Sequence, residues 1–372
     1  MLLTLLLATE TSPPKPLLLA HYMPWYESRP VSGHWGWHWT MGKLDPDRGE
    51  AASHYRPLMG LYDSGDLQTI NCHLSLMKLA GIDGIFVDWY GDVDHYDYGI
   101  IHRNTQKLFH ATRRMGMKFA LVYEDQTVPQ LIRGGKFAES DAVAQGKRLF
   151  GWVERNWFRS AHYLKQGGKP VLLVFGPQYY QPEQWRAMLP QTAFYTLHYR
   201  REPALGAYDW PYPREAGSRE AFRKRAQTMP AFIPVAFPRF HDYYAQAGVH
   251  ESWGHIGDDG GKTYERTLKE SLSASMPFVQ IATWNDWGEG TQIEPSKEFG
   301  YRDLETTQRL TKSRFRPADL RLPIRLFALQ KKHYGKAKVQ ERLAAIGSLL
   351  NSGRTSEAER RVDKAEAELR AR

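Results

Sequence analysis

Residues 277–295 read PFVQIATWNDWGEGTQIEP, an apolar run followed by a loop rich in acidic and aromatic side chains. The run 278–283 predicts a buried strand, because it is short, apolar and bounded by turn residues. Three carboxylates, two tryptophans and two amides then fall within thirteen residues. The apolar neighbours offer these acids no partners, which favours a functional loop over a packed turn. Such a strand exit is typical of a site that stacks sugar rings and transfers protons at a glycosidic oxygen.

Seven further segments read as strands, and longer amphipathic stretches separate several of them. The expected strands are 17–22, 84–88, 118–124, 170–175, 194–198, 206–208 and 232–236, with helices near 67–79, 104–115 and 141–164. About eight strands alternating with helices predict an α/β fold, a (β/α)8 TIM barrel with long βα loops. A doubly wound sheet is the alternative, but residues 22–26 lack the Gly-rich turn that it normally places after its first strand.

The chain divides into three expected parts. Residues 1–16 form an N-terminal tail or signal remnant, 17–310 the catalytic barrel and 311–372 a C-terminal helical extension with apolar residues at helical spacing. The apolar run 1–8 is too short to cross a membrane and lacks a basic start, so the location is open, with a periplasmic or secreted protein as one possibility. No membrane span is expected elsewhere.

The net charge of +9 arises from 50 Lys and Arg against 41 Asp and Glu. The excess lies in residues 301–372, which hold 18 basic and 9 acidic residues, while residues 1–300 hold 32 of each sign. A nucleic-acid enzyme would concentrate positive charge around its site, so no nucleic-acid partner is expected. The single cysteine, Cys72, rules out an intrachain disulfide and reads as a small buried hydrophobe.

Residues at strand exits are the candidates for substrate binding, because the chemistry of a barrel lies where its strands end. The candidates are His21, Tyr22, Trp25, Tyr26, Asp88, Trp89, Tyr123, Glu124, His198, Tyr208, Trp284, Asn285, Trp287, Gln292 and Glu294. Structural readings stay open for several of them. His21 fits a core histidine, Glu294 fits a loop-fixing acid, and one of the two loop tryptophans fits a place inside the barrel.

The long first loop, 24–62, contains four of the twelve tryptophans within fifteen residues, together with three histidines. Indole rings cover the flat C–H faces of sugars well, although some of these rings are expected to cap the barrel instead. The neighbours of these histidines are tryptophans rather than further ligands, so no metal site is expected.

Four sequence blocks resemble glycoside hydrolase family 99, the endo-α-mannosidase and endo-α-mannanase family. The blocks are AHYMPWY (20–26), HYRPL with GLYDS (54–64), MKLAGIDG leading to DWYG (77–91) and WNDWGEGTQIEP (284–295). The resemblance covers roughly residues 17–310. It implies a (β/α)8 barrel that cleaves α-mannosidic bonds inside a glycan, an oligosaccharide or polysaccharide partner, and no metal or cofactor.

The resemblance also implies roles for two acids. Asp286 takes the place of the carboxylate that removes a proton from the substrate's own C2 hydroxyl, so that O2 attacks C1. Glu289 takes the place of the general acid and base, and the configuration is retained. The family normally has Glu where this chain has Asp286, and His where it has Gly288. An offset near an ångström can cost on the order of a hundredfold in rate.

Other functions stay open at this stage. The stretch WNDWGE and AHYM (20–23) also resemble glycoside hydrolase family 71, the α-1,3-glucanases, so an α-glucan is an alternative substrate. A carbohydrate-binding barrel without catalysis is the alternative from another class, because two loop positions differ from family 99. The oligomeric state, the sugar linkage and the number of subsites are not fixed by the sequence.

Overall fold

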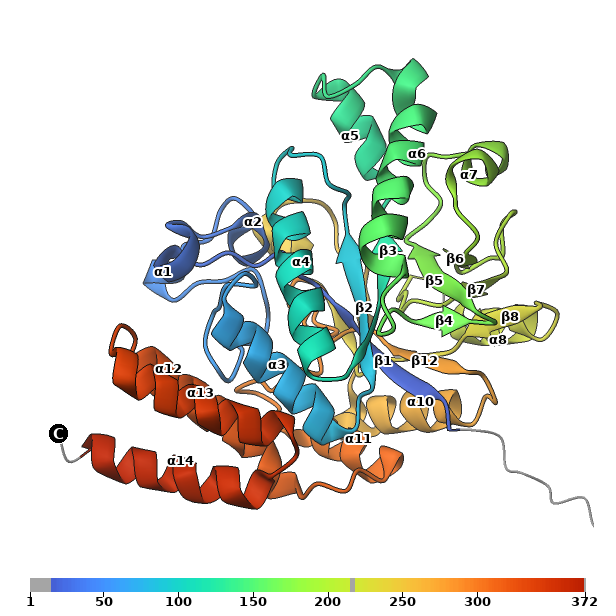
Figure 1. The fold of residues 1–372 in the computed structure, drawn as a ribbon. Helices are drawn as coiled ribbons and strands as arrows, with labels where there is room; N and C mark the ends of the chain where they lie inside the picture. Colours follow the sequence, from blue (N-terminus) through green and yellow to red (C-terminus); the bar gives the residue numbers. More distant parts are fainter. Residues whose placement is uncertain (1–14, 215–217, 371–372) are drawn as a thin grey trace, which may run out of the picture.

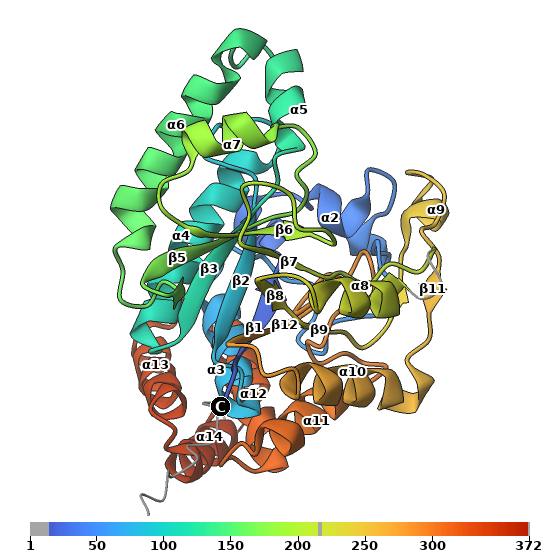
Figure 2. The same cartoon turned by 90° about the vertical axis from the view of Figure 1, so that its right-hand side faces the viewer.

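The computed structural model describes residues 15–214 and 218–370, and the expectation for residues 1–14 lies outside this part. Nine parallel strand segments form one continuous sheet ringed by helices (Figures 1 and 2). They are β1 (Leu17–Tyr22), β2 (Gly84–Trp89), β3 (Lys118–Tyr123), β5 (Lys169–Val174), β6 (Ala193–Leu197), β7 (Gly206–Tyr208), β8 (Ala231–Ile233), β9 (Val235–Ala236) and β12 (Phe278–Ile281).

The sheet closes into a barrel because β8 and β9 are two halves of one staggered strand, separated only by Pro234. The first half pairs with β7 and the second half pairs with β12, while β1 lies between β2 and β12. Pro234 has no N–H to donate, so the strand is interrupted there, and its carbonyl accepts from the N–H of Gln280 at 2.9 Å. Counted this way the barrel has eight strands. The predicted (β/α)8 barrel is confirmed, and the doubly wound sheet is excluded.

The barrel strands pack tightly enough to require glycine at two strand starts. A Cβ on Gly206 would collide with the carbonyl oxygen of Ala231, and a Cβ on Gly84 would collide with that of Lys118. Glycine permits this close backbone approach at a cost in chain entropy. The interior itself is apolar, with β1, β2, β3 and β5 almost wholly buried.

Fourteen α-helices lie in the described residues. They are α1 (Arg29–Ser32), α2 (Trp37–Thr40), α3 (Leu67–Ala80), α4 (Tyr98–Arg114), α5 (Thr127–Arg133), α6 (Ala142–Val153), α7 (Pro182–Met188), α8 (Ser218–Ala226), α9 (Tyr244–Ala247), α10 (Lys262–Leu272), α11 (Arg302–Thr311), α12 (Leu322–Lys332), α13 (Ala337–Asn351) and α14 (Thr355–Arg370). Shorter pieces are β4 (Lys165–Gln166), β10 (Phe240–His241), β11 (His255–Ile256), the 3-10 turns Pro46–Arg48, Glu139–Asp141, Asp259–Gly261 and Pro317–Arg321, and a π turn at Glu154–Phe158.

Two predicted helices differ from the observed ones at their ends. The helix expected over 104–115 begins at Tyr98. Gly99 has a low helix propensity, but the buried side chain of Tyr98 holds the first turn in place. The helix expected over 141–164 ends at Val153 and continues only as a π turn to Phe158. By contrast α3 matches its prediction, with the Asp66 side chain accepting from the N–H of Gln68 at 3.1 Å at its start and left-handed Gly81 at its end.

The last three helices form a layer on the outside of the barrel. In Figure 1 the red helices α12–α14 lie beside the blue helix α3, and α12 and α13 both contact it. Their own apolar cluster includes Leu326, Leu343, Ile346, Leu350 and Val362. In the described part of the chain, no helix has the length and apolar character needed to cross a lipid bilayer.

Candidate active site

The loop that follows β12 folds back on itself and presents its two central acids at a tip. The N–H of Thr283 donates to the carbonyl of Thr291 at 3.0 Å, and the N–H of Ile293 returns to the carbonyl of Thr283 at 3.0 Å. The hydroxyl of Thr283 accepts from the N–H of Asp286 at 2.8 Å. The loop is therefore a closed, hydrogen-bonded turn that fixes Asp286 and Glu289 relative to the strand end.

Asn285 ties this loop to the exit of β1. Its side-chain oxygen accepts from the N–H of Met23 at 2.8 Å, and its amide donates to the carbonyl of Met23 at 3.0 Å. The Tyr26 hydroxyl donates to the carbonyl of Asn285 at 3.0 Å and accepts from the N–H of Trp287 at 3.0 Å. Asn285 and Trp287 are thus placed in the framework of the loop.

Glu294 lies at the centre of a buried polar network beneath the loop. Its carboxylate accepts from the Tyr62 hydroxyl at 2.8 Å and from the indole N–H of Trp287 at 3.2 Å. The ring of His73 lies 3.1 Å away on the other oxygen, and its second nitrogen lies 2.9 Å from the Tyr22 hydroxyl. Every oxygen of this acid is occupied, which gives Glu294 a fixing role in this structure.

Asp286 and Glu289 lack such neutralising partners. The N–H of Glu289 donates to Oδ1 of Asp286 at 3.0 Å, and the indole N–H of Trp210 lies 3.3 Å from Oε2 of Glu289. Burial raises the pKa of Asp286 to about 6, although backbone amides of Glu289 and Gly288 oppose the rise. Burial, together with the nearby Asp286 carboxylate, raises the pKa of Glu289 well above its usual value. At neutral pH the arrangement supports one ionised acid beside one protonated acid.

Both acids line a cavity of about 820 Å³ at the carboxyl ends of the strands, large enough for several sugar rings. Six of the predicted binding residues also line it: His21, Trp25, Tyr26, Asp88, Glu124 and His198. The side chains of His21 and Asp88 are almost fully buried. The ring of His21 has no hydrogen-bond partner among the described residues, whereas Asp88 is hydrogen-bonded to the side chain of Glu124 and to the N–H of Trp89. Such groups are suited to hydroxyl groups of a ligand.

Strand alternation explains why other predicted residues do not line the cavity. Tyr22, Trp89 and Tyr123 are each adjacent in sequence to a lining residue and therefore point to the opposite face, toward the helices. Tyr22 contacts His73 of α3, Trp89 donates to His102 of α4 at 3.3 Å, and Tyr123 packs on aromatic rings of α6 and α7.

Three further predicted residues are buried within the protein rather than in the cavity wall. The Tyr208 hydroxyl donates to the carbonyl of Val174 at 3.0 Å. Trp284 lies against His73 with ring centroids 5.5 Å apart. Gln292 is buried, and its carbonyl accepts from Arg239 at 2.9 Å.

Sequence reasoning missed the residues that the segment 240–256 brings to the cavity. The N–H of His241 donates to the carbonyl of Glu289 at 2.8 Å, and that of Tyr243 to the carbonyl of Gly288 at 2.9 Å. Tyr244, His250 and Trp253 from this segment line the cavity, as do Trp37, His38, Tyr90, Phe175, Trp210 and Tyr212 from other loops. The tryptophans of the predicted loops could have indicated Trp37 and Trp210. No sequence pattern predicts the hydrogen bonds between residues 241–243 and 288–289.

Gly288 also lines the cavity, beside Asp286. A Cβ at this position would lie 3.2 Å from Cε of Met41 and 3.6 Å from Oδ1 of Asp286. The larger side chain that the family 99 resemblance implies here would displace Met41. The methionine occupies that space in this chain.

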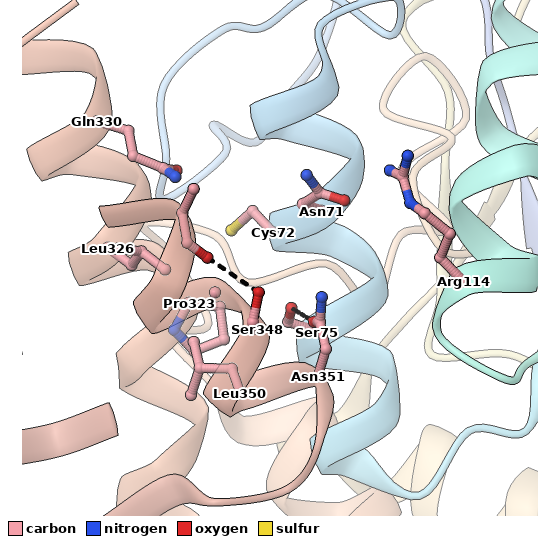
Figure 3. A pocket seen from close by; sticks show the side chains of 12 residues that line it. Asn71, Cys72, Ser75, Arg114, Pro323, Leu326, Gln330, Ser348, Leu350 and Asn351 are labelled. Carbon is pink, nitrogen blue, oxygen red and sulfur yellow. Dashed lines mark hydrogen bonds between the residues drawn. The ribbon is translucent and has the colours of Figure 1, made fainter. Parts of the chain in front are cut away.

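A second cavity, of about 250 Å³, lies outside the barrel between α3 and the C-terminal helices (Figure 3). Arg114, Cys72, Ser75 and Asn351 are among the residues around it, and Ser75 donates to Asn351 at 3.1 Å. It has no acidic side chain among its described lining residues. In residues 15–214 and 218–370, no three His, Cys, Asp or Glu side chains group so that they could hold a metal ion.

Comparison with known proteins finds relatives at low sequence identity. No family model matches the chain. A glycoprotein endo-α-1,2-mannosidase-like protein of Danio rerio is 21% identical over 318 residues, covering 73% of this chain and 69% of that protein. The Mus musculus protein of the same name is 22% identical over 324 residues, covering 74% and 69%.

Solved structures agree with these sequence relatives. The GH99 endo-α-mannosidase of Bacteroides thetaiotaomicron superposes with a TM-score of 0.60 at 18% identity, covering 82% of this chain and 98% of that chain. The chain is therefore similar to family 99 endo-α-mannosidases and shares their barrel fold. A structure described as a glycoside hydrolase-like protein matches less well, with a TM-score of 0.52 at 12% identity, covering 80% of this chain and 94% of that chain.

Proposed function

We propose that this chain cleaves α-linked glycans internally, with an α-mannoside as substrate and Asp286 and Glu289 as the catalytic acids. The supporting observation is that buried Asp286 and partly buried Glu289 line the same 820 Å³ cavity and have pKa values raised to different extents. An ionised base beside a protonated acid is the combination that glycoside cleavage needs. The relatives named endo-α-mannosidase support the choice of substrate.

In the proposed first step, ionised Asp286 removes the proton of the C2 hydroxyl, and O2 attacks C1. The C1–O bond to the leaving sugar breaks as Glu289 donates its proton to that oxygen. In the second step, Glu289 takes a proton from water, the water oxygen attacks C1, and the C1–O2 bond breaks. O2 regains the proton from Asp286, so both acids return to their starting states and the configuration is retained.

The surrounding residues are proposed to position the sugar. His21, Asp88, Glu124 and His198 offer polar groups at the cavity wall, while Trp25 and Tyr26 supply aromatic surface. Met23, which Asn285 holds by two hydrogen bonds, lines the cavity next to them. No step of this scheme uses a metal ion or cofactor.

The test is a screen of purified protein against α-mannans, α-1,3-glucan and other α-linked polysaccharides, read by product size and anomeric configuration. Release of internal fragments from α-mannan with retained configuration is the expected result. Cleavage of α-1,3-glucan instead would support the alternative function, that of an α-1,3-glucanase. Tight binding without cleavage of any polymer would identify a carbohydrate-binding barrel.

A further inference from the structure

A small aromatic cavity lies on the outside of the barrel, between α4 and the π turn Glu154–Phe158 that follows α6. Its volume is about 210 Å³, and Phe109, Trp152 and Trp157 form an apolar wall. Phe119, near the start of β3, also lines it, so it lies toward the amino-terminal ends of the strands, opposite to the active-site cavity. The described residues that line it are distinct from those of the active-site cavity. It is named the outer cavity below.

The π turn brings Trp152 and Trp157 to the same side of the chain. A π turn has hydrogen bonds between residues five positions apart, and these two tryptophans have that spacing. Their ring centroids lie 4.8 Å apart, and the ring of Phe109 on α4 lies 4.9 Å from that of Trp157. A regular continuation of α6 would turn the two indoles to different faces, because an α-helix repeats every 3.6 residues. Single π turns are rare and occur frequently at functional sites.

The indole N–H of Trp157 has no acceptor among the described residues, although this residue is only 6% exposed. Buried Trp39, by contrast, donates to the carbonyl of Tyr62 at 2.8 Å. Trp185 and Trp284 also lack an acceptor, but their N–H groups are sealed from solvent, whereas that of Trp157 is not. An indole N–H normally has a partner when its ring is buried. The outer cavity therefore presents a free donor beside its aromatic wall.

The rim of the outer cavity is polar and has no acidic side chain among its described residues. Gln106, His110 and Arg113 lie on one face of α4, because residues three and four positions apart are neighbours on a helix. They are exposed and make no hydrogen bond or ion pair with the described residues. On the other side of the cavity, the side-chain amide of Asn156 donates to the carbonyl of Trp152 at 2.8 Å, and its oxygen stays available. The rim therefore offers both donors and an acceptor to a ligand.

We propose that the outer cavity binds one pyranose ring of an α-linked glycan, apart from the catalytic site. A C–H face of the ring packs on Trp152, and one ring hydroxyl accepts from the N–H of Trp157. Neighbouring hydroxyls pair with Gln106, Arg113 and Asn156. The inference rests on the proposed function for the identity of the glycan, and it adds a second, non-catalytic binding site.

The chemistry of the outer cavity favours a sugar over other small ligands. A purely apolar ligand would leave the N–H of Trp157 and the polar rim without partners. An inorganic anion would pair with Arg113 but would leave the apolar wall uncovered. A pyranose has an apolar C–H face and several hydroxyl groups, so it satisfies both parts. The volume suits a single ring, in contrast to the 820 Å³ active-site cavity.

A second site affects polymers and short substrates differently. Once a polymer is held in the outer cavity, its binding in the active-site cavity becomes intramolecular, which raises the effective concentration. A short oligosaccharide does not reach both cavities, because they lie at opposite ends of the strands. Loss of the outer cavity should therefore raise KM for a polymer and leave KM for a short oligosaccharide unchanged.

The experiment compares variants on both kinds of substrate. Trp152→Ala removes part of the wall, and the double variant Gln106→Ala with Arg113→Ala removes two rim groups. Tyr334→Ala, at an aromatic residue that is 79% exposed and lies outside the cavity, is the matched control. KM and kcat are measured on α-mannan and on an α-mannose tetrasaccharide, and the Kd for α-mannan is measured by affinity electrophoresis.

The outer cavity predicts a selective change. Trp152→Ala should raise the Kd and KM for α-mannan by about threefold or more, because the second contact is lost. The double variant should shift both constants in the same direction, and Tyr334→Ala should leave them unchanged. For every variant, kcat and the constants on the tetrasaccharide should stay as in the unsubstituted protein. Crystals soaked with the tetrasaccharide should show a ring hydroxyl within hydrogen-bond distance of Nε1 of Trp157.

Three outcomes overturn the inference: a folded Trp152→Ala protein with unchanged Kd for α-mannan, an equal loss on both substrates, or only water beside Trp157 at saturating tetrasaccharide. If Trp152→Ala does not fold, the double variant decides. Failure of the proposed function is distinguishable, because then no α-glycan is cleaved, and the Kd difference between the variants still decides on the outer cavity. If the unsubstituted protein binds no α-glycan at all, both proposals are wrong.

Discussion

Glu289 and Glu294 lie five residues apart on one loop, yet their surroundings differ completely. Glu294 is bound by Tyr62, Trp287 and His73, and it lies away from the cavity. Glu289 faces the cavity, has one long contact to Trp210, and its pKa is raised by burial and by Asp286. The same side chain is thus a framework group at one position and a titratable group at the other.

The difference shows how one loop serves both stability and chemistry. A buried acid whose oxygens are all occupied has little freedom to exchange protons with a ligand. A buried acid with few donors is destabilising for the folded protein but is held ready to donate a proton. Mutation of the two glutamates should therefore affect different measurable quantities.

The largest expected effect is on turnover. Glu289→Gln is isosteric and removes the proton donor, so kcat should fall by about 10²–10⁴-fold while oligosaccharide binding persists. Initial rates on α-mannan and calorimetric binding would measure the two quantities. Full activity of Glu289→Gln would exclude this residue as the acid.

Truncation of the other glutamate should act on stability first. Glu294→Ala leaves His73, Tyr62 and Trp287 without their shared acceptor, and the free energy of unfolding should fall by about 3 kcal/mol. Chemical denaturation would measure it, with the exposed Glu251→Ala as control. A loss under about 0.5 kcal/mol would contradict the framework role of Glu294.

The pH dependence of turnover should report the acid pair. Below pH 6, kcat/KM should fall about tenfold per pH unit, because Asp286, with a pKa of about 6, becomes protonated and no longer acts as a base. At high pH the rate should fall again as Glu289 loses its proton. A rate profile whose acid limb lies near pH 4 would place the base elsewhere.

The smallest expected effect is a gain in stability. The pKa of Asp286 is raised in the folded state from 3.8 to about 6, so the folded protein binds this proton more tightly than the unfolded chain does. Stability is therefore lost as the pH rises from about 4 through 6. The shift sets this loss at about 3 kcal/mol at most, and Asp286→Asn removes it. The net rise in the free energy of unfolding at pH 8 should be about 1 kcal/mol, because the amide accepts more weakly than the carboxylate from the N–H groups of Glu289 and Gly288.

Denaturation of the Asp286→Asn protein and the unsubstituted protein at several pH values checks the sign. The difference between the two should shrink as the pH falls below 3.8, where the Asp286 side chain becomes neutral in the unfolded state as well as in the folded state. A difference that grows toward acidic pH would mean that the Asp286 carboxylate is stabilised by the fold.

Most of the fold was readable in the sequence. Short apolar runs such as 17–22 and 206–208 coincide with β1 and β7, because buried parallel strands are apolar along their whole length. The run 232–236 was read as one strand, and the structure divides it at Pro234 between two neighbours. A single sequence cannot show such a division, because it depends on the stagger of the closed barrel.

The site was readable only in part. Proximity to strand ends brought His21, Asp88 and Glu124 into the prediction, and they do line the cavity. The same criterion also selected Tyr22, Trp89 and Tyr123. Their side chains point toward the helices, because successive side chains along a strand point to opposite faces. The contribution of residues 240–256 depends on contacts between segments far apart in sequence, which periodicity cannot reveal.

The seventh barrel strand, which is divided at Pro234, closes the barrel wall and also leads into the segment that contacts Glu289. The residues that join the first and last parts of the wall continue within five positions into Phe240 and His241, whose segment covers Glu289. Loss of strand pairing at residues 231–236 would therefore expose Glu289 at the same time as it opens the barrel. Amide exchange of 231–236 and of 240–256 is accordingly expected to rise and fall together.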